Sequence, residues 1–409
     1  MSLKNDITKA QTVLRDTMTK PDFDTPINRI GTNCSKWDAL ESIYKIPADE
    51  GLAMWVADME FHPPQAVLDE LTNMVDHGVF GYYGDQTSYK NAIASWMARR
   101  HQWTVDPAWI FTTHGLVNAV AFCVQTWTKP SEAVILFTPV YHAFARTIKA
   151  NGRRVHESPL VNTDGRYTFD LSALEASLQG DEKMLIFCSP HNPGGRVWTR
   201  EELQGICDFC IKHNLLLVSD EIHHDLVFGN TKHTVMAHIS EAVKSRLVML
   251  TASSKTFNMA GAHCGNVIIE DAVLRNQFDE TLKANGISPN SFGIRMTEAA
   301  YKSGDEWLEA LLDYLTENRR VFDAGINAIP GLHSMALEAT YLAWVDFSGT
   351  GMDREEFTSR VERVAKIAAN HGPTFGSGGE NFMRFNIACP RAQIEDAVKR
   401  MGEAFADLQ

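Results

Sequence analysis

The chain has 409 residues, of which 44% are hydrophobic and 22% are charged. This length and composition allow a large core and two domains, and they exclude a mostly disordered protein. The net charge of -13 argues against broad binding to nucleic acid or to anionic membranes. No segment has the apolar length of a bilayer span, and residues 1–11 lack the apolar core of a signal peptide, so we expect a cytoplasmic protein.

Short apolar segments alternate with amphipathic segments between about residue 110 and residue 270. Amphipathic residues 116–127 and 199–213 have helical periodicity, and the second segment opens with Thr199 and Glu202 at capping-box spacing. Continuous apolar character with many β-branched residues is typical of strands buried on both faces. Five segments have it: residues 133–139, 184–189, 215–220, 246–252 and 265–270. The alternation predicts an α/β fold, with a mostly parallel central sheet sandwiched by helices.

A different pattern follows residue 304. A long helical segment extends to Pro330 and is placed to bridge two domains. Beyond it, residues 339–347 and 382–388 are strand-like, residues 353–372 are helix-like, and a last amphipathic helix begins near residue 391. We therefore predict a large domain over residues 55–305 and a smaller α+β domain formed by residues 1–54 and 306–409.

Polar side chains follow three of the predicted strands. Asn192 comes after residues 184–189, Asp220 ends the next strand with His223 shortly after it, and Lys255 follows residues 246–252. Ligands of open parallel sheets bind outside the carboxyl ends of the strands. The sequence therefore predicts an amide, a carboxylate and an amine at one edge of the sheet.

This set of groups suits pyridoxal 5'-phosphate. A lysine amine can hold the aldehyde as a Schiff base and later act as a base. A carboxylate such as Asp220 keeps the ring nitrogen protonated, and an amide such as Asn192 can donate to the ring oxygen. Gly115 precedes a predicted helix, whose free backbone N–H groups favour a phosphate.

Each of these residues also has a purely structural interpretation. Lysines are mostly exposed, Asn192 could lie in an ordinary turn, and Asp220 could cap a helix. Their common position after strands of one sheet favours the cofactor site. Other motifs are incomplete: residues 253–256 lack the glycines of a P-loop, and residues 376–381 lack the last glycine of a dinucleotide fingerprint.

Metal and redox sites are not expected from the local motifs. The seven cysteines are scattered and odd in number, which argues against a disulfide framework. Cys207 and Cys210 form a C-x-x-C motif, but it lies in a segment with helical periodicity and has no second cysteine pair. His223 and His224 are adjacent and do not face together, so this pair does not predict a zinc site.

With these residues identified, the chain resembles fold type I pyridoxal-phosphate enzymes, the aspartate aminotransferase superfamily. Within it, the chain is most similar to the branch of cystathionine β-lyase-like carbon-sulfur lyases. The resemblance covers nearly the whole chain. The stretches that carry it are "NRIGTNCSKWD" (28–38), "MWVADMEF" (54–61), "GVFGYY" (78–83), "TPVYHAF" (138–144), "SPHNPGGRVWTREEL" (189–203), "SDEIHHD" (219–225), "SKTFNMAG" (254–261), "EATYLAWVDF" (338–347) and "NFMRFNIACPR" (381–391).

The resemblance implies roles for individual residues. Lys255 is expected to be the Schiff-base lysine and the catalytic base, while Arg384 binds the substrate α-carboxylate and Ala57 lines the substrate site. Tyr82 is expected to reach the phosphate of the neighbouring subunit, which implies a homodimer with shared active sites. The remaining cofactor contacts are expected from Asp220 (ring nitrogen), Asn192 and His223 (ring oxygen), Tyr141 (stacking on the ring), and the backbone N–H groups of Leu116 and Val117 (phosphate).

The expected phosphate site departs from the common pattern of the superfamily. Ala252 stands where a serine or glycine is frequent, and His263 stands where many members have an arginine. The lyase branch commonly lacks that arginine, so the departure agrees with the branch. A hydroxyl from Ser253 or Ser254 is the expected replacement.

The branch implies β-elimination from L-cystathionine or a related cysteine S-conjugate, which gives a thiol, pyruvate and ammonia. An aminotransferase of the same fold is the alternative, because the same cofactor site permits both reactions. A third hypothesis is a cofactor-binding regulator that acts through protein contact. A complete set of catalytic residues favours an enzyme over the regulator.

Overall fold

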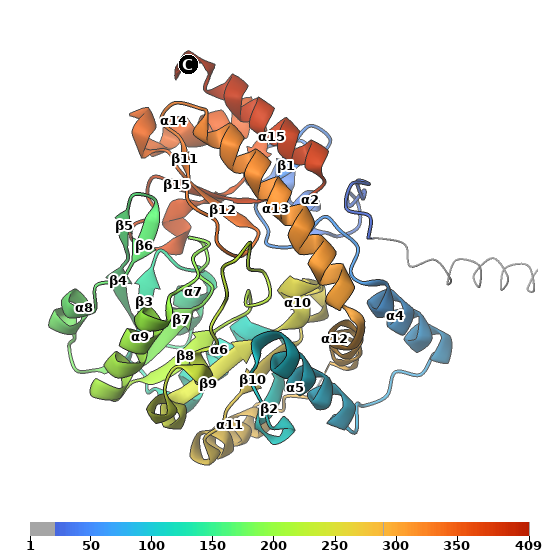
Figure 1. Ribbon diagram of the computed structural model, residues 1–409, viewed down its shortest axis with the longest axis vertical. Coiled ribbons are helices and arrows are strands. Elements are labelled where there is room, and N and C mark those ends of the chain that lie inside the picture. The colour runs from blue at the N-terminus through green and yellow to red at the C-terminus, as the bar shows by residue number, and fades with distance from the viewer. Residues whose placement is uncertain (1–20, 289, 409) are drawn as a thin grey trace, which may run out of the picture.

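The computed structural model describes residues 21–288 and 290–408 and contains two main sheets. The long helix α13 (Asp305–Asn327) extends from the region of the smaller sheet toward that of the larger sheet (Figure 1). Within the described residues, the larger sheet has seven strands. Its order is β2 (Ile110–Thr113), β10 (Gly265–Ile268), β9 (Leu247–Thr251), β8 (Leu216–Asp220), β7 (Glu182–Cys188), β3 (Ala133–Thr138) and β4 (Arg154–Pro159). The strands from β9 to β4 are parallel, and β10 pairs antiparallel with both of its neighbours.

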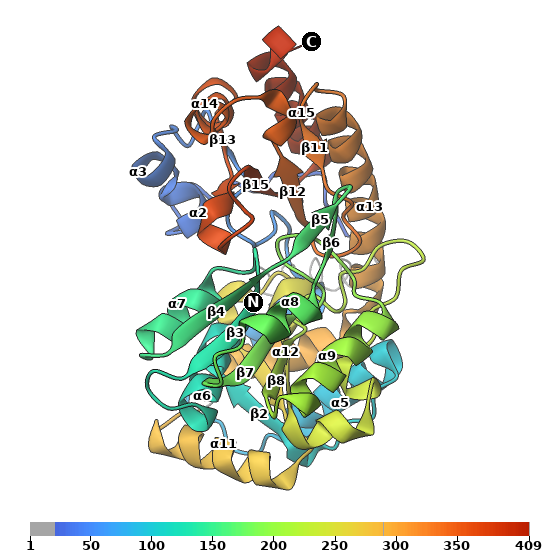
Figure 2. The ribbon, with the colours of Figure 1, turned by 90° about the vertical axis from the view of Figure 1, so that its left-hand side faces the viewer.

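Both faces of the larger sheet are buried, which explains why its strands are apolar throughout. In β3, Val134 and Leu136 pack in a cluster with residues of α6 (Leu116–Trp127), α7 (Ala143–Ala150) and α11 (Ala272–Ala284). Ile135 and Phe137 point the other way, into a cluster with residues of α5 (Thr87–His101) and α9 (Arg200–Lys212). Figure 2 shows α6 and α7 on one side of the sheet and α9 on the other. The predicted fold class is confirmed.

The second sheet is antiparallel and includes the C-terminal strands. Its order is β11 (His333–Ser334), β12 (Leu342–Asp346), β15 (Phe382–Asn386) and β14 (Asn370–His371). Near it, β1 (Leu52–Ala53) pairs in parallel with β13 (Ile367–Ala368), so the segment before residue 54 adjoins the C-terminal part of the chain. The predicted domain boundaries stay predictions, and residues 1–20 of the predicted small domain lie outside the described residues.

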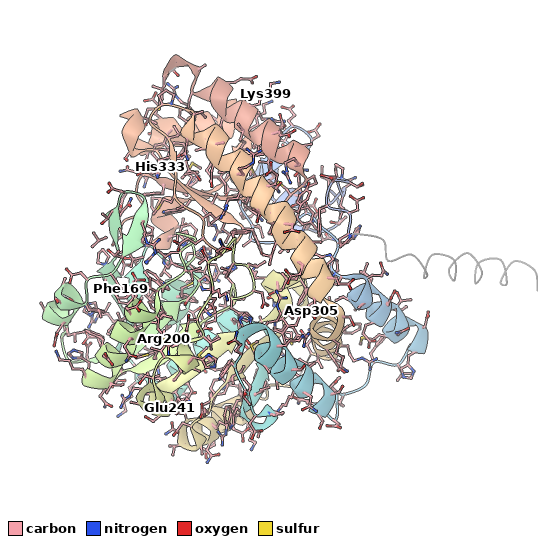
Figure 3. All side chains as sticks on the ribbon, viewed as in Figure 1. Phe169, Arg200, Glu241, Asp305, His333 and Lys399 are labelled. Carbon is pink, nitrogen blue, oxygen red and sulfur yellow. The ribbon has the colours of Figure 1, made fainter. Side chains whose placement is uncertain are left out.

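The long helix α13 (Asp305–Asn327) confirms the helical segment predicted after residue 304. Its buried side chains include Leu311, Leu315 and Phe322, which belong to the main core. Asp305, labelled in Figure 3, begins the helix and accepts a hydrogen bond from Arg99 of α5 at 3.0 Å. The final helix, α15 (Arg391–Ala404), also begins where predicted.

The helix predicted over residues 353–372 is wrong in its second half. α14 (Arg354–Ser359) continues as a short π-helix over Arg360–Val364, and the helical structure ends before Lys366, which has a φ of 54°. The next residues form β13 and β14, which pair with β1 and β15. Pairing with strands distant in sequence therefore overrides the local helical pattern.

The remaining elements are short or cover the surface. None of the described helices combines the length and hydrophobicity needed to cross a membrane. The other helices are α2 (Ser35–Asp38), α3 (Leu40–Tyr44), α4 (Gln65–His77), α8 (Leu171–Ser177), α10 (Ser253–Thr256) and α12 (Ser291–Ser303), and the hairpin strands are β5 (Val161–Thr163) and β6 (Arg166–Thr168).

Candidate active site

The carboxyl ends of β7, β8 and β9 meet at one edge of the larger sheet. Cys188 of β7 is paired with Asp220 of β8, and Asp220 is paired with Leu250 of β9. Asn192 follows β7, and Lys255 lies on α10, directly after β9. The structure thus brings the predicted amide, carboxylate and amine to the same edge.

Asp220 is a buried carboxyl group without a cationic hydrogen-bond partner among the described residues. It is 4% exposed, and its Oδ1 accepts a bond from the backbone N–H of Ile222 at 3.1 Å. Burial raises its pKa to about 7, although the charge of Lys255 opposes this shift. A protonated ring nitrogen placed here would compensate the buried charge, so Asp220 fits the role expected for it.

Lys255 is partly buried, and its Nζ donates a hydrogen bond to the carbonyl oxygen of Ala57 at 2.6 Å. Burial lowers its pKa to about 8, and the Asp58 carboxylate opposes this shift. A lysine with this pKa has a substantial neutral fraction near neutral pH, as a nucleophile and a base require. The same contact places Ala57 beside the amine.

Arg384 is 2% exposed and lies in the middle of β15. Its guanidinium donates to Asn192 Oδ1 at 3.0 Å, to Asn370 Oδ1 at 2.6 Å and to the carbonyl oxygen of Trp55 at 3.1 Å. Its Nε has no hydrogen-bond partner and no carboxylate of the described chain pairs with it. Burial without a counterion lowers its pKa to about 10. Such a group is suited to bind the carboxylate of a ligand.

Two ring-bearing side chains lie near these groups. His223 is buried, and its Nδ1 has no hydrogen-bond partner among the described residues. Its pKa is lowered well below the ordinary value, first by burial and then by the charges of Lys255 and Arg384. The neutral imidazole can therefore donate one hydrogen bond to a ligand or accept one from it. Tyr141 lies between β3 and α7, and its partly buried ring packs edge-on against Phe144.

A candidate phosphate cradle lies at the first turn of α6. Gly115 caps this helix with a φ of 90°, a conformation that favours glycine, so Leu116 and Val117 are its first two residues. The N–H groups of a first helical turn lack partners within the helix and favour an anion. A Cβ added at Gly115 would lie 3.9 Å from Nδ1 of His263, which places this exposed imidazole beside the cradle. The hydroxyl of Ser253 instead hydrogen-bonds to Thr297 Oγ1 at 2.8 Å.

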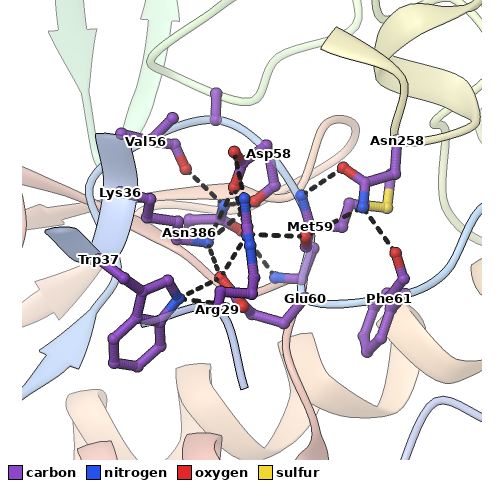
Figure 4. Close-up of polar contacts among 12 residues, drawn as sticks. Arg29, Lys36, Trp37, Val56, Asp58, Met59, Glu60, Phe61, Asn258 and Asn386 are labelled. Carbon is purple, nitrogen blue, oxygen red and sulfur yellow. Dashed lines mark hydrogen bonds and ion pairs between the residues drawn. The ribbon is translucent and has the colours of Figure 1, made fainter. Parts of the chain in front are cut away.

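The segment of residues 55–61, which carries Ala57, is held from both sides (Figure 4). Asn258, from the stretch that follows Lys255, donates to the carbonyl oxygens of Met59 and Phe61 at 3.0 and 2.7 Å. From β15, Asn386 donates to the carbonyl oxygens of Val56 and Asp58 at 2.7 and 2.5 Å. The lysine-bearing and arginine-bearing segments are thereby joined through residues 55–61.

Buried ion pairs add to this anchor. Lys36 is 1% exposed, and its Nζ lies 2.6 Å from Glu60 Oε1 and 3.4 Å from Asp58 Oδ1. Arg29 binds Asp58 through both terminal nitrogens at 2.9 Å and also contacts Glu60 at 3.0 Å. The pKa of Asp58 is consequently held below its ordinary value by Arg29 and Lys36, although burial acts in the opposite direction.

Tyr82 does not join the other site residues within this chain. It is fully exposed in the segment between α4 and α5. Exposed Val79 and Phe80 lie nearby in the sequence, and the ring of Phe80 lies 5.4 Å from the ring of Phe292. Apolar side chains concentrated on one surface mark a candidate contact with another protein chain.

Sequence reasoning missed several residues that hold the site together. Tyr341 donates its hydroxyl to the carbonyl oxygen of Ala57 at 3.0 Å, and Asn370 binds Arg384. Asn258 and Asn386 hold residues 55–61. Tyr341, Asn258 and Asn386 lie in stretches that carry the family resemblance, but a single sequence gives no signal for contacts between segments this far apart.

The aminotransferase class I and II family matches residues 55–401 of this chain. The chain belongs to this family. The matched range includes Asn192, Asp220 and Lys255 at the edge of the larger sheet. It also includes Arg384 of β15.

Several relatives within this group are named as lyases. The chain is 37% identical over 387 residues to cystathionine beta-lyase PatB of Bacillus subtilis, covering 94% of this chain and 100% of that protein. It is 32% identical to protein MalY of Escherichia coli, covering 92% of this chain and 97% of that one. Cystalysin from Treponema denticola, whose crystal structure contains a pyridoxal 5'-phosphate cofactor, has 36% identity and a TM-score of 0.91 and covers 96% of this chain and 100% of its own.

Proposed function

We propose that this protein is a pyridoxal-phosphate-dependent carbon-sulfur β-lyase. It would cleave L-cystathionine or a related cysteine S-conjugate to a thiol, pyruvate and ammonia. The observation that carries the assignment to a pyridoxal-phosphate enzyme is a buried, counterion-free Arg384 that is joined to Asn192 and, through residues 55–57, to Lys255, whose pKa is lowered to about 8. The family and the lyase names of several relatives support it.

The residues present fit the cofactor. Lys255 would be the attachment point, Asp220 would pair with the ring nitrogen, and Asn192 and His223 would bind the ring oxygen. Tyr141 would stack on the ring, and the first turn of α6, at Leu116 and Val117, would hold the phosphate. We assign His263 as an additional phosphate contact, because its imidazole lies beside Gly115 at the start of α6. When bound, the cofactor supplies an aldehyde and an electron-withdrawing ring.

The side chains of this chain then perform the steps around the substrate. Arg384 binds the α-carboxylate in a bidentate arrangement, and Asn192 and Asn370 hold the guanidinium in place. The Lys255 amine, in its neutral form, removes the α-proton and delivers a proton to the departing sulfur. Ala57 and Tyr341 orient the amine, because the carbonyl oxygen of Ala57 accepts bonds from both Lys255 and Tyr341.

The reaction type is tested with the holoenzyme and L-cystathionine in the absence of any keto acid. We expect equal amounts of thiol and pyruvate at a steady rate. Amino transfer that appears only after a keto acid is added, with neither thiol nor pyruvate before, would instead establish the aminotransferase alternative. A Lys255→Ala variant serves as the inactive control.

We also propose a homodimer in which Tyr82 reaches the phosphate site of the partner. The full exposure of Tyr82 and the neighbouring exposed Val79 and Phe80 support this proposal. The proposed substrate is a free amino acid, and the cytoplasmic location expected from the sequence stays a proposal.

A further inference from the structure

A cluster of buried imidazole and carboxylate groups lies outside the candidate active site. His101 ends α5, whereas His224 and Asp225 follow β8. One donor atom from each of the three residues lies within 4.8 Å of the other two. The side chains of His101, His224 and Asp225 are 7%, 1% and 0% exposed. Such a group of donors is either a hydrogen-bonded network or a ligand site.

Two ring nitrogens in this region are paired weakly or not at all. His224 Nε2 pairs with Asp225 Oδ2 at 3.3 Å, without good hydrogen-bond geometry. His233 holds Glu221 Oε2 at 2.7 Å through Nε2, and its Nδ1 is unpaired and buried. Both histidines line the same pocket of about 560 Å³, as do His101 and Asp225. The unpaired His233 Nδ1 and the weakly paired His224 Nε2 on a shared pocket point to a further ligand, because a buried polar atom left unsatisfied costs stability.

The donor types select the class of ligand. Imidazole nitrogen and carboxylate oxygen are the usual ligands of zinc and similar divalent ions, whereas calcium and magnesium prefer oxygen alone. The negative charge of the Asp225 carboxylate would repel an anionic ligand at this site. Arg100, on the rim of the pocket, is paired with Asp305 and Glu309, so its charge is already compensated.

The spacing is close to that of a tetrahedral site. Donors bound to one zinc ion at about 2.1 Å lie about 3.4 Å apart. His101 Nε2 lies 2.7 Å from Asp225 Oδ1, and His224 Nε2 lies 3.3 Å from Asp225 Oδ2. The two histidine rings touch edge to face, with centroids 4.2 Å apart. A bound ion would replace the hydrogen bond between His101 and Asp225, while Trp96 and Thr256 hold the Asp225 carboxylate in place.

We propose that His101, His224 and Asp225 bind a divalent transition-metal ion of the zinc class. The fourth coordination position faces the pocket, beside His233. This site is separate from the proposed cofactor residues but connected to them, since Asp225 Oδ2 also accepts a hydrogen bond at 2.8 Å from Thr256, the neighbour of Lys255. The adjacency of His223 and His224 does not exclude the site, because α5 supplies the other imidazole.

The test measures zinc bound to the holoenzyme. The protein is dialysed against zinc chloride and then against metal-free buffer, and its metal content is determined by mass spectrometry. We expect about one zinc per chain in the wild type. His101→Gln and His224→Gln should each lose it, and His333→Gln, an exposed histidine of β11 labelled in Figure 3, should retain it.

Two results would overturn the proposal: no stoichiometric zinc in the wild type, or zinc retained in both cluster variants. Cofactor absorbance and thermal unfolding verify that the variants are folded. If they are not folded, the wild type titrated with cobalt(II) decides the question. Intense visible bands of a tetrahedral nitrogen and oxygen site support the proposal, and the weak spectrum of the hydrated ion refutes it.

Discussion

Replacement of Arg384 by lysine tests the proposed recognition of the α-carboxylate. The guanidinium can form two parallel bonds to a carboxylate, whereas an ammonium group forms one without the fork geometry. A hydrogen bond to a charged group contributes about 1.5–3 kcal/mol. Loss of one such bond from the transition state should therefore lower kcat/KM roughly 10- to 150-fold. Asn192 and Asn370 can still accept from the ammonium group, which limits damage to the fold.

The assay is the steady-state release of pyruvate from a cysteine S-conjugate. Arg319→Lys is the control, because Arg319 is partly buried and, like Arg384, donates to a backbone carbonyl oxygen, that of Leu337, but it stacks on Phe228 and contacts none of the proposed site residues. The absorbance of the bound cofactor should be unchanged in both variants. A kcat/KM for Arg384→Lys within about twofold of the control would refute the assignment of Arg384 to the substrate carboxylate.

Three further changes test the cofactor site and the dimer. Asp220→Asn should abolish activity. The folded-state pKa of Asp220, about 7, exceeds the ordinary 3.8, so the ionised carboxylate costs the wild-type apoenzyme stability as pH rises between these values. In denaturant titrations above pH 7, the variant apoenzyme should therefore be more stable than the wild type by up to about 4 kcal/mol. His263→Ala should weaken cofactor retention in equilibrium dialysis. The control is His333→Ala, an exposed histidine of β11, and equal retention in the two variants would remove His263 from the phosphate site. Mixing inactive Lys255→Ala chains with inactive Tyr82→Ala chains should restore activity, because one of the two sites in each mixed dimer has both an intact Lys255 and an intact Tyr82. No recovery of activity after subunit exchange would argue against shared sites.

The sequence by itself predicted the architecture of the larger sheet and the three groups at its edge. Strands buried on both faces are apolar throughout, so β3 and β7 to β9 stand out from the amphipathic helices between them. Parallel strands align their carboxyl ends, so the order of Asn192, Asp220 and Lys255 in the chain was enough to predict their proximity. A local pattern was sufficient here because each group directly follows its own strand.

Only the tertiary structure decided which distant segments support these groups. Residues 365–372 continue a helical pattern but form β13 and β14, because pairing with β1 and β15 satisfies their backbone groups. Long-range side-chain contacts likewise hold Ala57 beside Lys255 and bring α5 to the histidines that follow β8. The sequence around a polar residue does not indicate which distant residue it will hydrogen-bond in the folded protein.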